Sequence, residues 1–381
     1  MNIWDWVLRE VDESRKAGRH RLAELILRVP QLATDDEHSP LDAVMPEALA
    51  LARAAKNPWL EVYFRHWNLQ SRILHRLEVS EWMTEAAQLL DFAHSDEVRG
   101  CPQSVCVTQD FAACFGSVDG PAYVEERLAA ASETLARINA QWPCFTCISS
   151  ERASALLDGA RPEETLAFLD RQEAALVAEG QGRQRHRFLN SRCAALLDLG
   201  RPEAALELLR NAGDPPDENE RKERAIDEAR VLAVLGRGEE GAALLPPFER
   251  IRGAPNLYRQ WAEAVCALVE VGAYLNGHAL ERTLLEMEDR LTSCGAVRKA
   301  FNTAHDRARM ALRRSARATA LHACARMEAL LPKLRRPLGA DAELAEIRAE
   351  AEALPPPRPV LPDLPGDFDA WSGTDPEKTL E

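Results

Sequence analysis

The cysteines around QWPCFTC (141–147) have the spacing in this sequence that most resembles a metal-binding or redox site. Cys144 and Cys147 are separated by two residues, and Cys101 and Cys106 lie upstream. Four thiolates that converge tetrahedrally would bind structural zinc, which is one interpretation. A thioredoxin-like redox pair is a second, but that motif follows a β-strand, and the pattern here predicts none. Packing in a hydrophobic core is the third.

An internal repeat favours the packing interpretation. PQSVCVTQDFA (102–112) and PCFTCISSERA (143–153) share one residue pattern. Cys106 and Cys147 are therefore the same repeat position seen twice, and one repeat further upstream that position is Val62. Because cysteine packs well where valine does, we expect a packing role and no cofactor, with zinc as the alternative.

The sequence does not predict a disulfide. The nine cysteines are odd in number, and in the cytoplasm they are expected to be reduced thiols. Equivalent positions on adjacent helices lie roughly 10 Å apart, too far for a bond between Cys106 and Cys147. Cys144 has no repeat equivalent, so a special role for it requires that it meet Cys101 across the helix starts.

The repeat itself predicts the fold. Three stretches share an apolar helix end, a glycine-containing break and a second amphipathic helix: LLDGARPEETLAFL (156–169), LLDLGRPEAALELL (196–209) and LAVLGRGEEGAALL (232–245). Gly200 and Gly236 suit the left-handed cap that ends a helix. Pro162 and Pro202 suit the first turn of the next helix. A helix–turn–helix unit of this size cannot bury its apolar faces alone, so neighbouring units must stack.

These units resemble the tetratricopeptide repeat. Six residues fall at that family's packing positions: Leu189, Cys193, Leu196, Gly200, Ala205 and Leu209. Trp261 takes the place of the family's first aromatic, with Val265 and Leu268 in step. The period is longer here, and Arg192 stands where an apolar residue is usual. The resemblance implies an all-α fold, a right-handed superhelix of about seven antiparallel helix pairs.

The predicted organisation has four parts. Residues 1–56 form an N-terminal helical cap, 57–335 the repeats, 336–354 a last helix and 355–381 a disordered acidic, proline-rich tail. The predicted helix pairs are 57–76 with 79–95, 102–116 with 121–139, 143–158 with 162–178, 184–199 with 202–212, 218–235 with 239–251, 256–271 with 277–293 and 297–316 with 318–331.

Composition limits the classes of function. The 381 residues are 46% hydrophobic and carry a net charge of −14, which argues against a general nucleic-acid-binding surface. No apolar run is long enough to cross a membrane, and the acidic N-terminus lacks the features of a signal peptide, so a cytoplasmic protein is expected. Phosphate loops, HExxH pairs and nucleophile elbows are absent from the sequence, so no catalytic residue is assigned.

Residues 298–336 are the one basic segment. They contain 11 Lys or Arg and two acids, and His305, Arg309, Arg313 and Arg317 recur every four residues, as on one stripe of a helix. A solvated helix face is the plain interpretation. The alternatives are docking of nucleic acid or a phosphate-bearing ligand, or of the acidic tail 363–381 with its two aromatics, Phe368 and Trp371, as in a regulatory sensor.

The resemblance implies a non-catalytic scaffold that binds a partner protein's peptide or helix. In the family, the first helices of the pairs line the concave groove. The candidate contact residues on those helices are Arg65, His66, Arg72, Arg185, Asn190, Arg224, Asp227, Arg230, Tyr258, Asn302 and His305.

Overall fold

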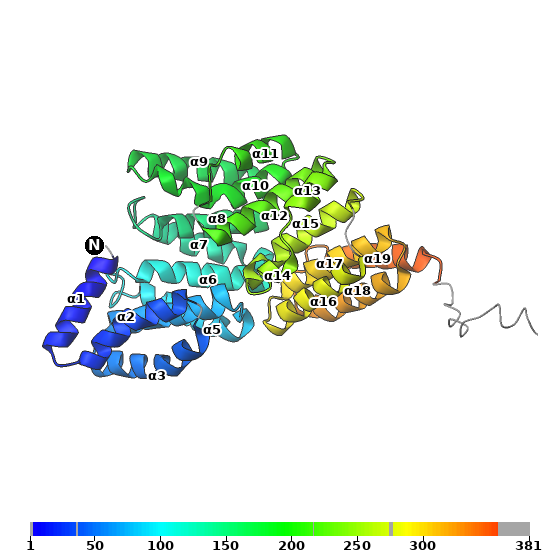
Figure 1. The fold of residues 1–381 in the computed structure, drawn as a ribbon. Helices are drawn as coiled ribbons and strands as arrows, with labels where there is room; N and C mark the ends of the chain where they lie inside the picture. Colours follow the sequence, from blue (N-terminus) through cyan, green and yellow to red (C-terminus); the bar gives the residue numbers. More distant parts are fainter. Residues whose placement is uncertain (1–2, 36, 216, 274–276, 357–381) are drawn as a thin grey trace, which may run out of the picture.

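A computed structural model describes residues 3–35, 37–215, 217–273 and 277–356, and shows an all-α protein (Figure 1). The described residues form helices and contain no strand, which confirms the all-α part of the predicted fold class. The predicted tail 355–381, with Phe368 and Trp371, lies outside the described residues except for its first two positions. No helix among the described residues has the length and apolar character needed to cross a membrane.

Most helices lie close to their predicted bounds, but the predicted helix 239–251 is broken before Pro246 and Pro247 into two shorter helices, since proline cannot continue the helical hydrogen bonds. Three precede the first predicted pair: α1 (Ile3–Lys16), α2 (His20–Thr34) and α3 (His38–Ala54). The pairs are α4 (Pro58–Leu69) with α5 (Val79–His94), α6 (Ser104–Asp119) with α7 (Val124–Leu135), α8 (Phe145–Asp158) with α9 (Pro162–Ala178), α10 (Leu189–Asp198) with α11 (Pro202–Arg210), α12 (Glu218–Val234) with α13 (Gly238–Leu244), α15 (Tyr258–Glu270) with α16 (Gly277–Ser293), and α17 (Val297–Arg313) with α18 (Arg317–Leu330). The short α14 (Phe248–Ile251) precedes α15, and α19 (Ala340–Ala353) ends the described fold. The division into cap, array and last helix stays a prediction.

Shorter helical segments extend several of these helices. A π-helix, η1 (Gln70–His75), continues α4, and 3-10 turns join other elements: η2 (Gly120–Tyr123), η3 (Gly182–Phe188), η4 (Pro255–Leu257) and η5 (Leu331–Lys333).

Glycine and proline end and begin the helices as the repeats predict. Gly200 and Gly236 have φ of +65° and +73°, the left-handed conformation that glycine adopts without steric cost. Pro162 and Pro202 stand in the first turns of α9 and α11. In the first of the three repeats Ala160 takes the left-handed position instead, with φ of +53°.

Six helices form a closed ring, which we name the inner helices: α6, α8, α10, α12, α15 and α17. Each packs on the next in that order, and α17 packs back on α6. In Figure 1 the chain accordingly runs from α6 through the green helices and returns beside α6 with the yellow α17. One continuous hydrophobic core contains side chains from both halves of the chain, such as Val107 and Phe301.

Two sets of polar contacts join the ends of the ring. Asp119, which is 1% exposed at the end of α6, accepts hydrogen bonds from Arg298 Nε (2.9 Å) and from the backbone N–H groups of Arg335 (2.8 Å) and Arg336 (3.2 Å). Val79 N donates to the carbonyl of Cys294 at 3.1 Å. Backbone N–H groups thus find acceptors far away in sequence across the closure.

Candidate functional site

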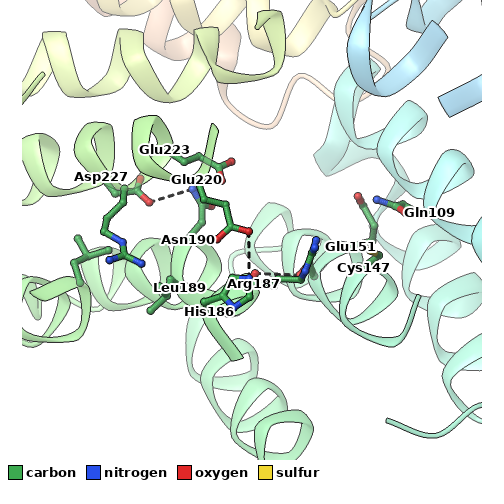
Figure 2. Close-up of a pocket in the computed structure, with 13 residues that line it drawn as sticks. Gln109, Cys147, Glu151, His186, Arg187, Leu189, Asn190, Glu220, Glu223 and Asp227 are labelled. Carbon is green, nitrogen blue, oxygen red and sulfur yellow. Dashed lines mark hydrogen bonds and ion pairs between the residues drawn. The ribbon is translucent and has the colours of Figure 1, made fainter. Parts of the chain in front are cut away.

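A cavity of about 190 Å³ lies between the inner helices α6, α8, α10 and α12 (Figure 2). Its lining is polar and mostly charged. The lining residues are Gln109, Cys147, Ser150, Glu151, His186, Arg187, Leu189, Asn190, Leu209, Glu220, Glu223, Arg224 and Asp227. The inner helices α6, α8, α10 and α12, together with η3 and α11, therefore contribute to one partly open space.

Helix α12 supplies most of the charge. Glu220, Glu223 and Asp227 are spaced by three and four residues, so they lie on one face of the helix. Asp217 caps this helix by accepting the N–H of Glu220 at 2.8 Å, which fixes where the face begins. Figure 2 shows these carboxylates bordering the same space as Glu151 of α8.

The carboxyl groups of the cavity are poorly neutralised. Burial, followed by the charge of Glu223, raises the pKa of Asp227 to about 8. Burial also raises the pKa of Glu223 and of Glu151 to about 7 each. Asp227 accepts a hydrogen bond from the neutral amide of Asn190 at 3.2 Å. The nearby Arg230 is paired with Glu263 at 2.6 Å, outside the cavity lining.

Two of the basic residues that line the cavity have partners within the protein. His186 Nε2 lies 3.2 Å from Glu220, and Arg224 donates to the carbonyl of Gly213. On the far side of Glu151, burial lowers the pKa of Lys299, against the attraction of Asp158 and Glu151. The arrangement suits the binding of a cationic group, which would supply the charge that the buried carboxylates lack.

The raised pKa of Asp227 predicts a pH dependence of stability. Between about pH 4 and pH 8 the folded protein retains a proton on this carboxyl that the unfolded chain releases, so stability falls as pH rises through that window. We expect Asp227→Asn to exceed wild type in free energy of unfolding by about 1 kcal/mol or more at pH 8 and to be close to it at pH 4. Urea unfolding at both pH values measures this, and a variant less stable than wild type at pH 8 would contradict it.

The predicted groove residues fall in several places. Asn190, Arg224 and Asp227 line the cavity, and Arg185 lines a separate groove between α9 and α11. Asn302 is half-buried on α17. The others contact neighbouring elements: Arg65 pairs with Glu85, His66 with the buried Asp110 at 2.6 Å, Arg72 with Asp42 and Glu78, Arg230 with Glu263, Tyr258 with the carbonyl of Arg252, and His305 with Asp306. Partner binding by this set stays a prediction.

The predicted basic stripe is shorter than expected. Helix α17 ends at Arg313, and Arg317 begins α18, so the prediction of four residues on one helix was wrong. Ser315, with φ of +53°, makes the turn that separates them. His305, Arg309 and Arg313 do line one groove, opposite acidic residues of α19.

The expectation that all cysteines are free thiols was also wrong. Cys106 and Cys144 form a disulfide, with their Cα atoms 6.0 Å apart. Cys144 is the N-cap of α8, so it precedes the helix and reaches the first turn of α6. The spacing of roughly 10 Å applies to equivalent positions within helices, such as Cys106 and Cys147. Cys101 is not the partner of Cys144 and instead lies 3.8 Å from the carbonyl of Trp59.

The burial of the cysteines bears on the packing interpretation, and the side chains gathered around them bear on the zinc interpretation. Cys101 and Cys106 are buried, and Cys147 is half-buried and lines the cavity. Over the described residues, no three His, Cys, Asp or Glu side chains come together in a group that could hold a metal ion.

Some residues of the cavity escaped the sequence analysis. Glu223 and Glu151 were not predicted, although the spacing of Glu220, Glu223 and Asp227 shows that these three share a helix face. The position of Glu151 opposite them depends on how α8 and α12 sit in the ring, which the repeat pattern does not specify.

The fold and this site together define the class of protein: the described part of the chain is all-helical, and its packed helices line an acidic cavity. A comparison with protein-family models gives no match, and a search of curated proteins also gives none.

Proposed function

We propose that the protein is a non-catalytic scaffold, a tetratricopeptide-like right-handed array that binds a partner protein through the inner helices. The observation that carries the proposal is the cavity in which Glu151, Glu223 and Asp227 have no cationic partner within ion-pair distance among the residues that the structure describes. The first helices of the pairs line this cavity, as the first helices line the binding groove in the family that the repeats resemble.

The ligand that fits this chemistry is a basic side chain of a partner peptide. A lysine or arginine side chain would bring a positive charge to carboxylates that burial disfavours in their charged form. Attraction between opposite charges is stronger in such enclosed surroundings than in water. The modest volume suits one long side chain, with the rest of the peptide lying over the mouth of the cavity.

Binding of peptide arrays tests this proposal. Wild-type protein is expected to retain peptides that contain lysine or arginine and to lose them when those residues become alanine. Glu223→Gln with Asp227→Asn is expected to weaken binding at least about thirtyfold, the effect of removing one side of an enclosed charge pair. Glu239→Gln, an exposed glutamate on α13, is the matched control and should bind as wild type does. Equal peptide affinity of wild type and the double variant would contradict the proposal.

The basic segment offers less support for a nucleic-acid or phosphate site. Four of its arginines have carboxylate partners within the protein: Arg298 with Asp119, Arg307 with Glu288, Arg309 with Glu270 and Arg326 with Glu288 and Asp289. Charges that are already paired contribute little to the counterion release that drives nucleic-acid binding. Docking of the tail 363–381 concerns residues outside those described.

A further inference from the structure

The Cys106–Cys144 disulfide joins two adjacent inner helices at one end. Cys106 is in the first turn of α6, and Cys144 is the N-cap of α8. The bond closes a segment with a sequence separation of 38 residues, which includes the whole of α7. It therefore fixes how the start of α6 lies against the start of α8.

Each bonded cysteine is one helical turn from the wall of the cavity. Gln109 follows Cys106 by three residues, and Cys147 follows Cys144 by three. Both of these following residues line the cavity. Because positions three apart are neighbours on a helix surface, the disulfide lies directly beside the cavity on both helices.

Other anchors hold α6 without a covalent bond. Near its start, Ser104 Oγ donates to the carbonyl of Arg99 at 3.5 Å, and the hydroxyls of Thr108 and Thr134 lie 2.7 Å apart. Asp110 is 2.6 Å from His66 of α4, and Asp119 accepts from Arg298 at the other end. At its first turn, α6 is bonded covalently to α8 alone. Loss of the disulfide would remove the covalent tie between this turn and α8 and leave the noncovalent anchors of α6 in place, so we expect a local change at the cavity wall and no loss of the fold.

We propose that this disulfide is a reversible thiol–disulfide exchange site, which a dithiol reductant opens and which thereby alters the cavity. The second part rests on the proposed function. Cys144 is 9% exposed and Cys106 is 5% exposed, so Cys144 is the more accessible of the two. A thiolate of the reductant attacks Cys144 Sγ, the S–S bond breaks, and Cys106 leaves as a thiolate that takes up a proton. The second thiol of the reductant then attacks the mixed disulfide and releases Cys144 as a thiol. The protein gains two thiols and the dithiol becomes a disulfide; a disulfide oxidant reverses both steps.

Cys147 has a separate role beside this bond. Burial raises the pKa of its thiol, so at neutral pH it is a poor nucleophile toward the adjacent disulfide. Exchange through an external dithiol is therefore the route expected, and Cys147 remains part of the cavity wall.

Thiol counting by mass spectrometry tests the exchange site. Alkylation of the unfolded, unreduced chain is expected to label seven cysteines, and nine after dithiothreitol treatment of the folded protein. Oxidised glutathione should restore seven. Labelling of nine cysteines without reduction would overturn the proposal, as would a disulfide that dithiothreitol opens only after unfolding. Cys324→Ala, a free cysteine on α18, is the control and should lose one label in each state.

The effect on the cavity has its own readouts. Hydrogen exchange over 104–110 and 144–151 is expected to quicken on reduction in wild type and to be independent of redox state in Cys106→Ser with Cys144→Ser. Affinity for a lysine-containing peptide should change at least about fivefold between the two states. Peptide binding that is equal in both states would overturn the coupling and leave the proposed function standing. If no peptide binds at all, the proposed function fails, and hydrogen exchange alone decides whether the bond controls the cavity wall.

Discussion

Replacement of Asp119 by alanine is expected to lower the free energy of unfolding by about 3–5 kcal/mol, the cost of leaving the partners of a buried charge unpaired. Asp119 is 1% exposed and has three partners across the ring closure. Its loss removes the acceptor of Arg298 Nε and of the N–H groups of Arg335 and Arg336, while the Arg298 guanidinium keeps the carbonyl of Arg336. A buried donor without an acceptor carries the full cost of its lost hydration.

Two further variants make the Asp119 result specific. Asp119→Asn keeps one carbonyl oxygen and nearly the same shape, so it should lose less stability than Asp119→Ala. Asp91→Ala removes an exposed aspartate from α5 and should stay within about 0.5 kcal/mol of wild type. Urea unfolding measures all three. Faster hydrogen exchange at 76–80 and 290–295 in Asp119→Ala would show that the ring closure is loosened, and an unchanged free energy of unfolding would refute its role.

The ring closure shows what the repeat pattern leaves undetermined. The glycine and proline positions predicted where helices end, because Gly200 and Pro202 act on the chain immediately beside them. Asp119 and Arg298 are 179 residues apart, and neither stands out as a repeat position. Which distant helices meet depends on the small rotation between successive pairs, summed around the array. The summed rotation cannot be read from the sequence of any one repeat.

The candidate site was predicted in part for the same reason. Asn190 and Asp227 were assigned to the inner face from their places on the first helices of the pairs, and both line the cavity. Arg65 and Arg72 had the same assignment, yet both pair with neighbouring carboxylates. Helix periodicity gives the face on which a side chain lies. Whether a carboxylate of the next helix is near enough to pair with it follows from packing.

The disulfide was missed because the sequence argument compared equivalent positions. Cys106 and Cys147 share a repeat position, and helices at ordinary packing distances hold such residues too far apart for a bond. Cys144 lies before the first turn of α8, where the chain approaches from α7. The direction of that approach depends on the connection between α7 and α8.

The basic segment leads to the last prediction, which concerns Glu288. The sequence shows an excess of positive charge over 298–336 but not where the compensating acids lie. Glu288, on α16, is 0% exposed and pairs with two arginines of that segment, with Arg307 at 3.0 Å and with Arg326. Arg307 is also 0% exposed and pairs with Glu281 at 2.8 Å. The fold thus encloses part of the basic segment as ion pairs.

Glu288→Ala is expected to cost about 3–5 kcal/mol of unfolding free energy, because it leaves the buried Arg307 short of a partner. Glu286→Ala is a matched control on the same helix, since Glu286 pairs with Arg252 at 3.1 Å on the surface, where both side chains are about half exposed. That exposed pair should be worth less than about 1 kcal/mol. Urea unfolding at low and high salt compares the two: the Glu286 effect should shrink with salt, and the Glu288 effect should persist.

Replacing both members of the buried pair separates its net value from the cost of breaking it. Glu288→Leu with Arg307→Met removes both charges together and should recover most of the stability that Glu288→Ala loses, since apolar residues of similar volume substitute well for a buried ion pair. Arg326 keeps Asp289 as its partner in this variant. A double variant as unstable as Glu288→Ala would mean that packing around Glu281 and His322, and not charge, determines the loss.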